Sequence, residues 1–133
     1  NQFVAGFVGS PQMNLLTLQC QGQTARLGQG KLPLPSGLSK PPRQVVLGVR
    51  PEDMRLAQES DSIRFLGEVF LVENLGMQNL LSVRLAPGEG EQGPVEVRSL
   101  LPSDLDWGGD TIELAVSPER LHWFDVESGD RLS

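Results

Sequence analysis

The sequence is poor in the residues that build reactive centres. Its 133 residues include one cysteine, one histidine and no tyrosine, and aromatic residues make up 5% of the chain. Cys20 has no partner for an internal disulfide, which suits a reducing cytoplasm, and a lone cysteine more often fills core space than reacts. With His122 as the single histidine, the ligands of a common zinc site are missing. We therefore predict no metal centre in this chain.

Long apolar runs and basic clusters are also missing. No stretch reaches the roughly 18 apolar residues of a membrane-spanning helix, and no secretory signal peptide is visible. The 17 acidic residues outnumber the 11 lysines and arginines and give a net charge of −6. An acidic surface repels phosphate backbones, and barrels that bind oligonucleotides use basic, aromatic-rich sheets. No nucleic-acid partner is expected.

The sequence contains no phosphate-binding loop. Such a loop has the pattern G-x-x-x-x-G-K-[ST], in which backbone N–H groups surround the phosphates. The one Gly-Lys pair is Gly30-Lys31, but Ala25 stands at the first glycine position and Leu32 follows the lysine. We predict that this chain does not hydrolyse ATP, and we expect no catalytic or cofactor-binding residues in it.

Turn-forming residues, in contrast, are abundant, with 15 glycines and 10 prolines. This composition favours many short strands over long helices, and the length suits one domain. Alternation of apolar and polar residues predicts eight strands and a short terminal one, the eight being Asn14–Cys20, Gln23–Leu27, Gln44–Val49, Ile63–Asn74, Asn79–Leu85, Pro94–Leu100, Thr111–Val116 and Leu121–Phe124. The predicted fold is all-β, a small antiparallel barrel or sandwich of seven to nine short strands.

Three segments stand apart from this pattern. Gln2–Val8 could form a short N-terminal helix, ended by Gly9-Ser10-Pro11. The stretch Gly28–Arg43 holds four prolines and three glycines and is predicted to be an exposed loop. Ile63–Asn74 is apolar on both faces in places, which predicts a strand that is buried twice or bends between two layers.

The sequence also contains an internal repeat. Leu47–Leu56 and Leu114–Trp123 share Leu, Val, Pro and Glu in register. Each copy predicts a strand, one helical turn and a second strand, because proline suits the first helical position and glutamate faces the positive end of the peptide dipoles. The result would be two related half-units, each with an acidic Pro-Glu corner.

Several polar and aromatic residues allow two interpretations. Glu52 and Asp53 either complement the dipoles of a one-turn helix or form an intersubunit contact with Arg50 as partner, and both can hold together. His122 could pair with Asp125, but no nucleophile accompanies them, and an imidazole at a strand end is favoured.

Two further features also have a favoured interpretation. A simple turn is favoured over a calcium loop at 125–130, because the chain ends before the bidentate glutamate of such a loop. Core or interface burial is favoured over sugar stacking for Trp107 and Trp123.

Four segments, in order along the chain, resemble the maltose/glycerol-3-phosphate-type, or carbohydrate-type, ABC importer ATPases. They match the family patterns F-V-A-G-F-[IV]-G-S-P-x-M-N-[FL]-L, L-G-[IV]-R-P-E-[HD]-[LM], G-x-V-x-x-V-E-x-L-G and P-E-x-x-H-x-F-D-x-x-[ST]-G-x-R-L, at Phe3–Leu16, Leu47–Met54, Gly67–Gly76 and Ser117–Leu132. Any one segment alone is a weak signal, but four in the family's order span the whole chain.

The resemblance implies the C-terminal regulatory domain of such an ATPase, a transport-associated (TOBE) barrel of the oligonucleotide/oligosaccharide-binding (OB) type. Residues 1–14 would be the end of the linker or helix from a missing nucleotide-binding domain, and residues 15–133 the barrel. ATP and Mg²⁺ would then bind in that missing domain. The absence of an initiator methionine favours the same expectation of a longer parent.

The resemblance also implies a location and partners. The domain would lie in the cytoplasm at the inner face of the membrane, and it would hold two ATPase subunits together as a homodimer. Its other partners would be the parent's nucleotide-binding domain, the permease subunits and, in some relatives, a regulatory protein. The positions that match the dimer contact are Arg50, Pro51, Glu52 and Phe124. The competing hypothesis is a free-standing barrel that binds a small oligosaccharide or oxyanion.

Overall fold

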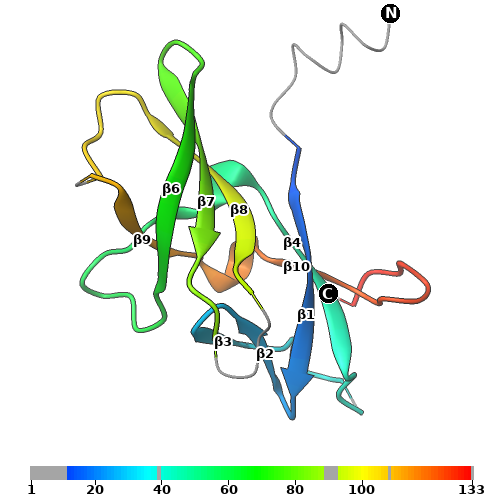
Figure 1. The fold of residues 1–133 in the computed structure, drawn as a ribbon. Helices are drawn as coiled ribbons and strands as arrows, with labels where there is room; N and C mark the ends of the chain where they lie inside the picture. The colour runs from blue at the N-terminus through cyan, green and yellow to red at the C-terminus, as the bar shows by residue number, and fades with distance from the viewer. Residues whose placement is uncertain (1–11, 39, 89–92, 108, 133) are drawn as a thin grey trace, which may run out of the picture.

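The computed structural model describes residues 12–38, 40–88, 93–107 and 109–132 (Figure 1). Within these ranges the chain folds into ten strands and two one-turn 3₁₀ helices, arranged as two antiparallel five-stranded sheets. The all-β prediction is therefore confirmed. The predicted helix Gln2–Val8 lies outside the described residues.

The first sheet brings both ends of the described chain together. Its strand order is β10-β4-β1-β2-β3, and all neighbours are antiparallel. The strands are β1 (Asn14–Gln21), β2 (Thr24–Leu27), β3 (Gly30–Pro33), β4 (Gln44–Val49) and β10 (His122–Phe124).

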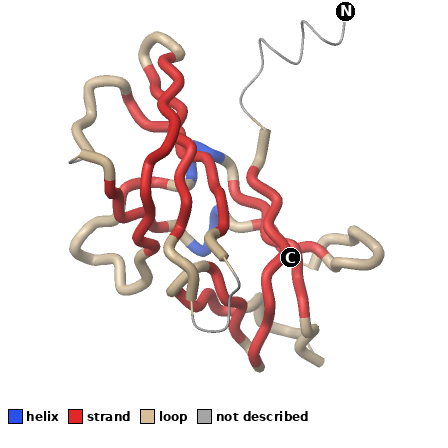
Figure 2. The backbone as a smooth tube through the Cα atoms, viewed as in Figure 1, coloured by secondary structure: helices blue, strands red, loops and turns tan. Residues whose placement is uncertain are grey.

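The second sheet contains the longest strand and the longest hairpin. Its order is β5-β9-β6-β7-β8, again with antiparallel neighbours. The strands are β5 (Arg55–Leu56), β6 (Phe65–Asn74), β7 (Gln78–Leu85), β8 (Val95–Pro102) and β9 (Thr111–Ala115). In Figure 2 the long strands of this sheet stand beside β1 and β4 of the first sheet, so that the two sheets form a curled half-barrel.

One apolar core fills the space between the sheets. Alternate residues of β4 and β7 point into it, as the completely buried Val45, Leu47, Leu81 and Val83 show. Trp123 of β10, 4% exposed, belongs to the same cluster, and Trp107 packs against its edge. The preference for burial is thus confirmed for Trp123, whereas Trp107 is half-buried.

The two sheets are joined where β1 meets β8. The Asn14 side-chain amide donates to the carbonyl oxygens of Val49 (3.1 Å) and Arg98 (3.0 Å), and its oxygen accepts from the Arg98 N–H at 2.8 Å. A second link connects β8 to the residue that follows the turn Pro51–Asp53, because the Ser99 hydroxyl donates to the Met54 carbonyl. Because these side chains satisfy buried backbone groups, they join the sheets without a continuous strand ladder.

The predicted repeat exists as two strand–turn–strand units. β4, η1 (Pro51–Asp53) and β5 form one unit, and β9, η2 (Pro118–Arg120) and β10 form the other. The units exchange strands, because β10 pairs with β4 and β5 pairs with β9. Each proline stands in the first turn of its 3₁₀ helix, as the sequence predicted.

Two short strands were not predicted. The structure has ten strands in its described ranges, whereas seven to nine were expected. β3 lies inside the supposed loop Gly28–Arg43, where Leu32 and Leu34 are buried. Its four residues alternate too briefly to be detected, and Pro33 argues against a strand. β5 has two residues and no pattern of its own. The predicted terminal strand is a single bridge between Phe124 and Arg131.

The prediction for the apolar stretch 63–74 is only partly correct. The register of β6 against β7 shifts between Val69 and Leu71, so the expected irregularity is present. Beyond that shift, however, Phe70, Leu71 and Val72 are exposed rather than buried on both faces. This part of β6 is therefore largely in contact with solvent, although the Arg84 guanidinium stacks on the Phe70 ring.

Candidate functional site

The first Pro-Glu corner is a rigid turn with exposed charges. Pro51 and Met54 are completely buried, while Arg50 and Glu52 are exposed. The Asp53 N–H donates to the Arg50 carbonyl at 2.9 Å, and the Met54 N–H donates to the Pro51 carbonyl at 3.3 Å. Pro51 therefore anchors the turn from inside, and Arg50 and Glu52 are the side chains that can reach a partner.

Phe124 lies on the outer face of the first sheet, over a glycine. A Cβ atom placed on Gly48 would lie 3.1 Å from the Phe124 ring and 2.6 Å from the Met13 sulfur, with Leu15 next to them at 3.5 Å. A side chain at position 48 would displace this cluster. Since Leu15 is 65% exposed, the cluster forms an accessible apolar surface.

His122 lies between the charged corner and this apolar cluster. β10 pairs with β4 so that His122 is opposite Gly48 and Phe124 is opposite Val46. The Arg131 guanidinium approaches the imidazole Nδ1 at 2.8 Å. Burial, followed by the charges of Arg131 and Arg50, lowers the pKa of His122, while Asp53 acts in the opposite direction. The pKa of His122 thus depends on the charged side chains of the corner.

Of the four predicted contact residues, Arg50 and Phe124 lie on the same side of the molecule as His122, whereas Pro51 is completely buried and cannot contact a partner. We call this surface the corner face and define it by Met13, Leu15, Arg50, Asp53, His122 and Phe124, with Glu52 on the adjoining turn. It combines an apolar centre with both signs of charge at its edge. Such a composition is typical of a protein–protein contact.

The two corners are tied together by Arg55. Its guanidinium donates to both carboxylate oxygens of Asp61, at 2.8 and 2.9 Å, and to the Ser117 hydroxyl at 3.1 and 3.3 Å. The Gln58 N–H also donates to Asp61, at 2.7 Å. The hydrogen bond from Arg55 and then that from Gln58 hold the pKa of the Asp61 carboxyl well below its usual range. This network fixes the loop after β5 to the start of η2.

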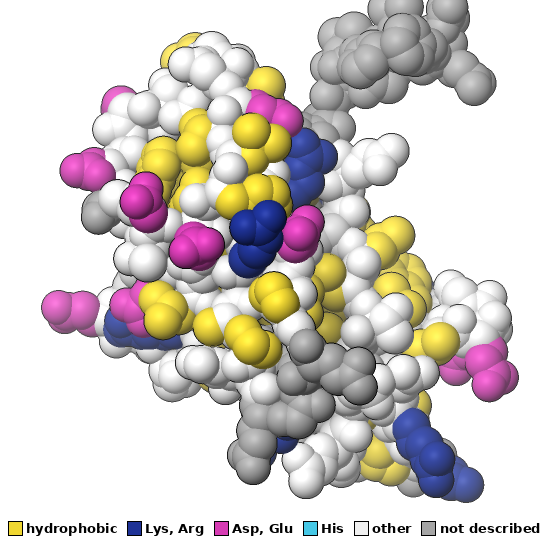
Figure 3. Space-filling view, viewed as in Figure 1, with side chains coloured by type: hydrophobic (Ala, Val, Ile, Leu, Met, Phe, Trp, Pro, Cys, Tyr) yellow, Lys and Arg dark blue, Asp and Glu magenta, His cyan; other side chains and the backbone are white. Residues whose placement is uncertain are grey.

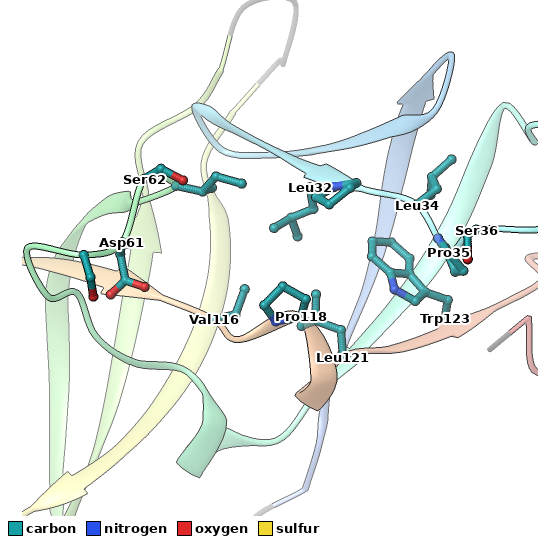
Figure 4. A pocket seen from close by; sticks show the side chains of 13 residues that line it. Leu32, Leu34, Pro35, Ser36, Asp61, Ser62, Val116, Pro118, Leu121 and Trp123 are labelled. Atoms are coloured by element: carbon teal, nitrogen blue, oxygen red, sulfur yellow. The ribbon is translucent and has the colours of Figure 1, made fainter.

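A pocket of about 520 Å³ opens beside this network. Figure 4 shows Leu32 on one wall, Val116, Pro118 and Leu121 on another, and Trp123 at the side. Asp61 is the one ionisable side chain among the lining residues, and its carboxylate already binds Arg55. The pocket is thus mainly apolar, and its one carboxylate is paired with Arg55.

The comparisons with known proteins agree with this geometry. Residues 47–124, which include both Pro-Glu corners, match the family model of the TOBE domain. The chain belongs to the TOBE domain family. Residues 9–54 of this TOBE domain also match the model described as the MalK OB fold domain. The predicted OB-like, transport-associated fold is confirmed.

Curated relatives cover nearly all of this TOBE domain. It is 32% identical over 137 residues to the xylose/arabinose import ATP-binding protein XacK of Haloferax volcanii. The aligned region covers 99% of the chain and 35% of XacK. It is 36% identical to the alpha-glucoside transport ATP-binding protein AglK of Rhizobium meliloti, with 95% of the chain and 35% of AglK covered. The sn-glycerol-3-phosphate import ATP-binding protein UgpC of Paracoccus denitrificans is also 36% identical, with 99% and 35% covered.

These relatives confirm the resemblance to carbohydrate-type importer ATPases. The TOBE domain spans about a third of the length of the curated relatives that it matches. All three are named as import or transport ATP-binding proteins.

Other candidate residues of the TOBE domain have structural partners. Asp125 accepts hydrogen bonds from the N–H groups of Glu127 and Ser128, both at 2.9 Å, and these bonds lower its pKa. The segment 125–130 is thus the predicted turn. The ring nitrogen of His122 that has a partner faces Arg131 rather than Asp125. In the described ranges, no group of three or more His, Cys, Asp or Glu side chains could hold a metal ion.

Nothing in the sequence indicated Asn14, Arg55 or Ser99 as structural residues of the TOBE domain. Partners lie 84 residues away for Asn14 and Arg98, 62 for Arg55 and Ser117, and 45 for Ser99 and Met54, so no local pattern connects them. The described part of the chain contains no helix long and apolar enough to cross a bilayer.

Proposed function

We propose that this chain is the regulatory and dimerisation domain of the ATP-binding subunit of a carbohydrate-type ABC importer, non-catalytic by itself. The match to the TOBE and MalK OB fold models and the names of the relatives support this proposal. The nucleotide-binding domain of the parent would bind ATP and Mg²⁺, and the linker from it would precede β1, since Asn14 is part of that strand. The parent would work at the inner face of the membrane with permease subunits, and a regulatory protein is a further possible partner.

The work of the domain is mechanical. A persistent contact between two copies keeps two ATPase units at high effective concentration, so that their closure on nucleotide becomes an intramolecular event. A two-fold contact requires a self-complementary surface. The single observation that carries the proposal is the corner face, on which an exposed apolar cluster adjoins Arg50 and the Pro-Glu turn.

The first Pro-Glu turn carries charges of both signs, which can pair across a two-fold axis. Arg50 and Glu52 are two residues apart and both exposed, so Arg50 of one copy can pair with Glu52 of the other in both directions. Exposed ion pairs contribute little affinity, typically about 0.2–1 kcal/mol each, and mainly set register. The apolar cluster around Phe124 would supply most of the binding free energy.

Sedimentation equilibrium of the 133-residue chain tests the contact. We expect a concentration-dependent dimer that Glu52→Lys weakens, that Arg50→Glu weakens, and that the double variant with both changes restores. Glu119→Lys in the second corner is the matched control, because Glu119 is equally exposed on the repeated turn. A strict monomer at high concentration would contradict the proposal, and a dimer that neither Glu52→Lys nor Arg50→Glu weakens would place the contact elsewhere.

A ligand-binding barrel is the second candidate, and the pocket beside Asp61 is the observation that favours it. No cationic side chain is among the residues that line this pocket, which favours a neutral sugar over an oxyanion. Calorimetry of the chain with maltose, xylose and phosphate separates the two functions. Tight binding of a sugar by a monomeric chain would support this candidate over dimerisation.

A further inference from the structure

Arg131 determines which nitrogen of the His122 ring carries the proton. A nitrogen of its guanidinium lies 2.8 Å from Nδ1 of the imidazole. A guanidinium has only donors and keeps its charge in proteins, so Nδ1 must be the acceptor of this hydrogen bond. The hydrogen of the neutral ring is therefore on Nε2, and the structure holds His122 as one neutral tautomer.

Protonation of this ring is incompatible with the contact to Arg131. The second proton of an imidazolium would occupy Nδ1, the atom that accepts from the guanidinium. The other nitrogen, Nε2, is buried and has no hydrogen-bond partner in the part of the chain that the structure describes. His122 is therefore either neutral and bound to Arg131, or charged and repelled by it.

The charges around His122 are balanced while the ring is neutral. Arg131 approaches the ring from the C-terminal segment, and Arg50 and Asp53 act on it from the first Pro-Glu corner. With the exposed Glu52 of the same corner, these side chains are two cations and two anions. An imidazolium would give this side of the molecule an excess of positive charge.

The neighbours of His122 within the sheet are uncharged. β10 places it opposite Gly48, over which the apolar cluster of the corner face lies. Burial is the first cause that lowers the pKa of His122, and the charges of Arg131 and Arg50 follow. A contact that covers the apolar cluster removes further water from the ring, which disfavours its charged form still more.

His122 is the single histidine of the chain, and histidine is the side chain that ordinarily titrates between about pH 5 and about pH 8. Carboxylates and guanidinium groups ordinarily titrate outside this range. Figure 3 shows such groups next to one another over β6, β7 and β8, where Arg84 lies 3.7 Å from Glu96 and Arg98 lies 3.3 Å from Glu73. The corner face is therefore the described surface to which mild acid adds charge.

We propose that the corner face is a pH-dependent contact, in which protonation of His122 separates the two copies. The inference rests on the proposed function, because it requires a two-fold contact through this face. Each residue occurs twice in such a contact, so one proton per copy adds two like charges to the interface. Because these charges and the loss of water disfavour the imidazolium in the dimer, the monomer binds the proton more readily, and acid shifts the equilibrium towards the monomer.

Sedimentation equilibrium of the 133-residue chain at several pH values measures the dissociation constant of the dimer. Two protons per dimer can raise Kd by up to about 100-fold per pH unit below the histidine pKa. We expect Kd to be at least about tenfold higher at about pH 5.5 than at about pH 7.5. Far-UV circular dichroism at each pH shows whether the chain remains folded, since unfolding would also dissociate the dimer.

His122→Gln is the matched variant. Its side-chain oxygen can still accept from Arg131, but the amide does not titrate, so its Kd should be the same at both pH values. Proton NMR gives the reciprocal measurement, because the Hε1 signal of the single histidine reports its protonation. Since proton binding and dimerisation are linked, the pKa of His122 should be lower at high protein concentration than at low concentration.

Three outcomes overturn the inference and leave the proposed function intact. A dimer with the same Kd at both pH values, and a histidine pKa independent of protein concentration, would remove the pH dependence. A dimer that tightens in acid would place a carboxylate of the second copy against His122. An equal rise of Kd in wild type and His122→Gln would assign the effect to another group. A chain that is monomeric at every pH contradicts the proposed function itself.

Discussion

Arg55 and Ser117 join the two halves of the internal repeat. The Arg55 guanidinium, in the strand that follows the first Pro-Glu turn, donates to the hydroxyl of Ser117, which precedes the second turn, at 3.1 and 3.3 Å. The halves also pair as strands, β5 with β9 in one sheet and β4 with β10 in the other. The corner face is thus built by both halves together, with Arg50 and Asp53 from the first half and His122 and Phe124 from the second.

The Asp61 carboxylate should make stability depend on acid pH. Its pKa is lowered in the folded chain, so its contribution is present above the ordinary carboxyl pKa of about 3.9 and is lost as pH falls below that value. Asp61→Asn should therefore be less stable than wild type at about pH 7, and the difference should shrink towards about pH 3. Urea unfolding at both pH values measures it.

Glu59→Gln is the matched control, because Glu59 is exposed in the same loop. We expect this variant to follow the wild type at both pH values. A constant difference between Asp61→Asn and wild type would show that the carboxylate charge has no role in the Arg55 network.

Asn14 should be essential to the junction of the two sheets. Asn14→Ala leaves the Arg98 N–H and carbonyl without their partner, and unsatisfied backbone groups of this kind cost about 1–3 kcal/mol each. We expect a loss of about 2–4 kcal/mol in the free energy of unfolding. The exposed neighbour Gln19 offers a control, since Gln19→Ala on the same strand should change stability by less than about 0.5 kcal/mol. Equal effects at both positions would contradict the role of Asn14.

His122 should make the domain less stable at mildly acidic pH. Its pKa is lowered in the folded state, so the unfolded chain binds the proton more readily and stability falls as pH drops through the ordinary value of 6.5. His122→Gln can still accept from Arg131 but does not titrate, so its stability should change less between about pH 7.5 and about pH 5.5. Parallel urea titrations of both proteins measure this, and identical slopes would refute it.

Cys20 should react slowly in the folded domain. It is half-buried, and burial raises the pKa of its thiol, which lowers the fraction of reactive thiolate. Iodoacetamide at about pH 8 should alkylate it at least about tenfold more slowly than in urea-unfolded chain. Intact mass measured over time follows the reaction. A folded chain as reactive as N-acetylcysteine would indicate an accessible thiol instead.

Local patterns were sufficient for most of the secondary structure. Alternating residues located β4, β7, β8 and β9, and the Pro-Glu repeat located both 3₁₀ turns. They failed where strands were short or contained proline, as in β3, whose one buried leucine, Leu32, is explained only by its pairing with Ala25 of β2. The predicted contact residues came from family resemblance, since no local pattern distinguishes an exposed Arg50 or Phe124 from other surface residues.

The sequence by itself determined the all-β class, the repeated corners and the family, because these depend on residues that are near one another in the chain. Only the tertiary structure decided that Arg50, His122 and Phe124 share a face, that Asn14 joins two sheets, and that the apolar end of β6 is exposed. The physical reason is that a side chain's partner across a barrel depends on how distant strands pair. A strand that is apolar on both faces has the same sequence pattern whether its second face packs against a core or is exposed to solvent.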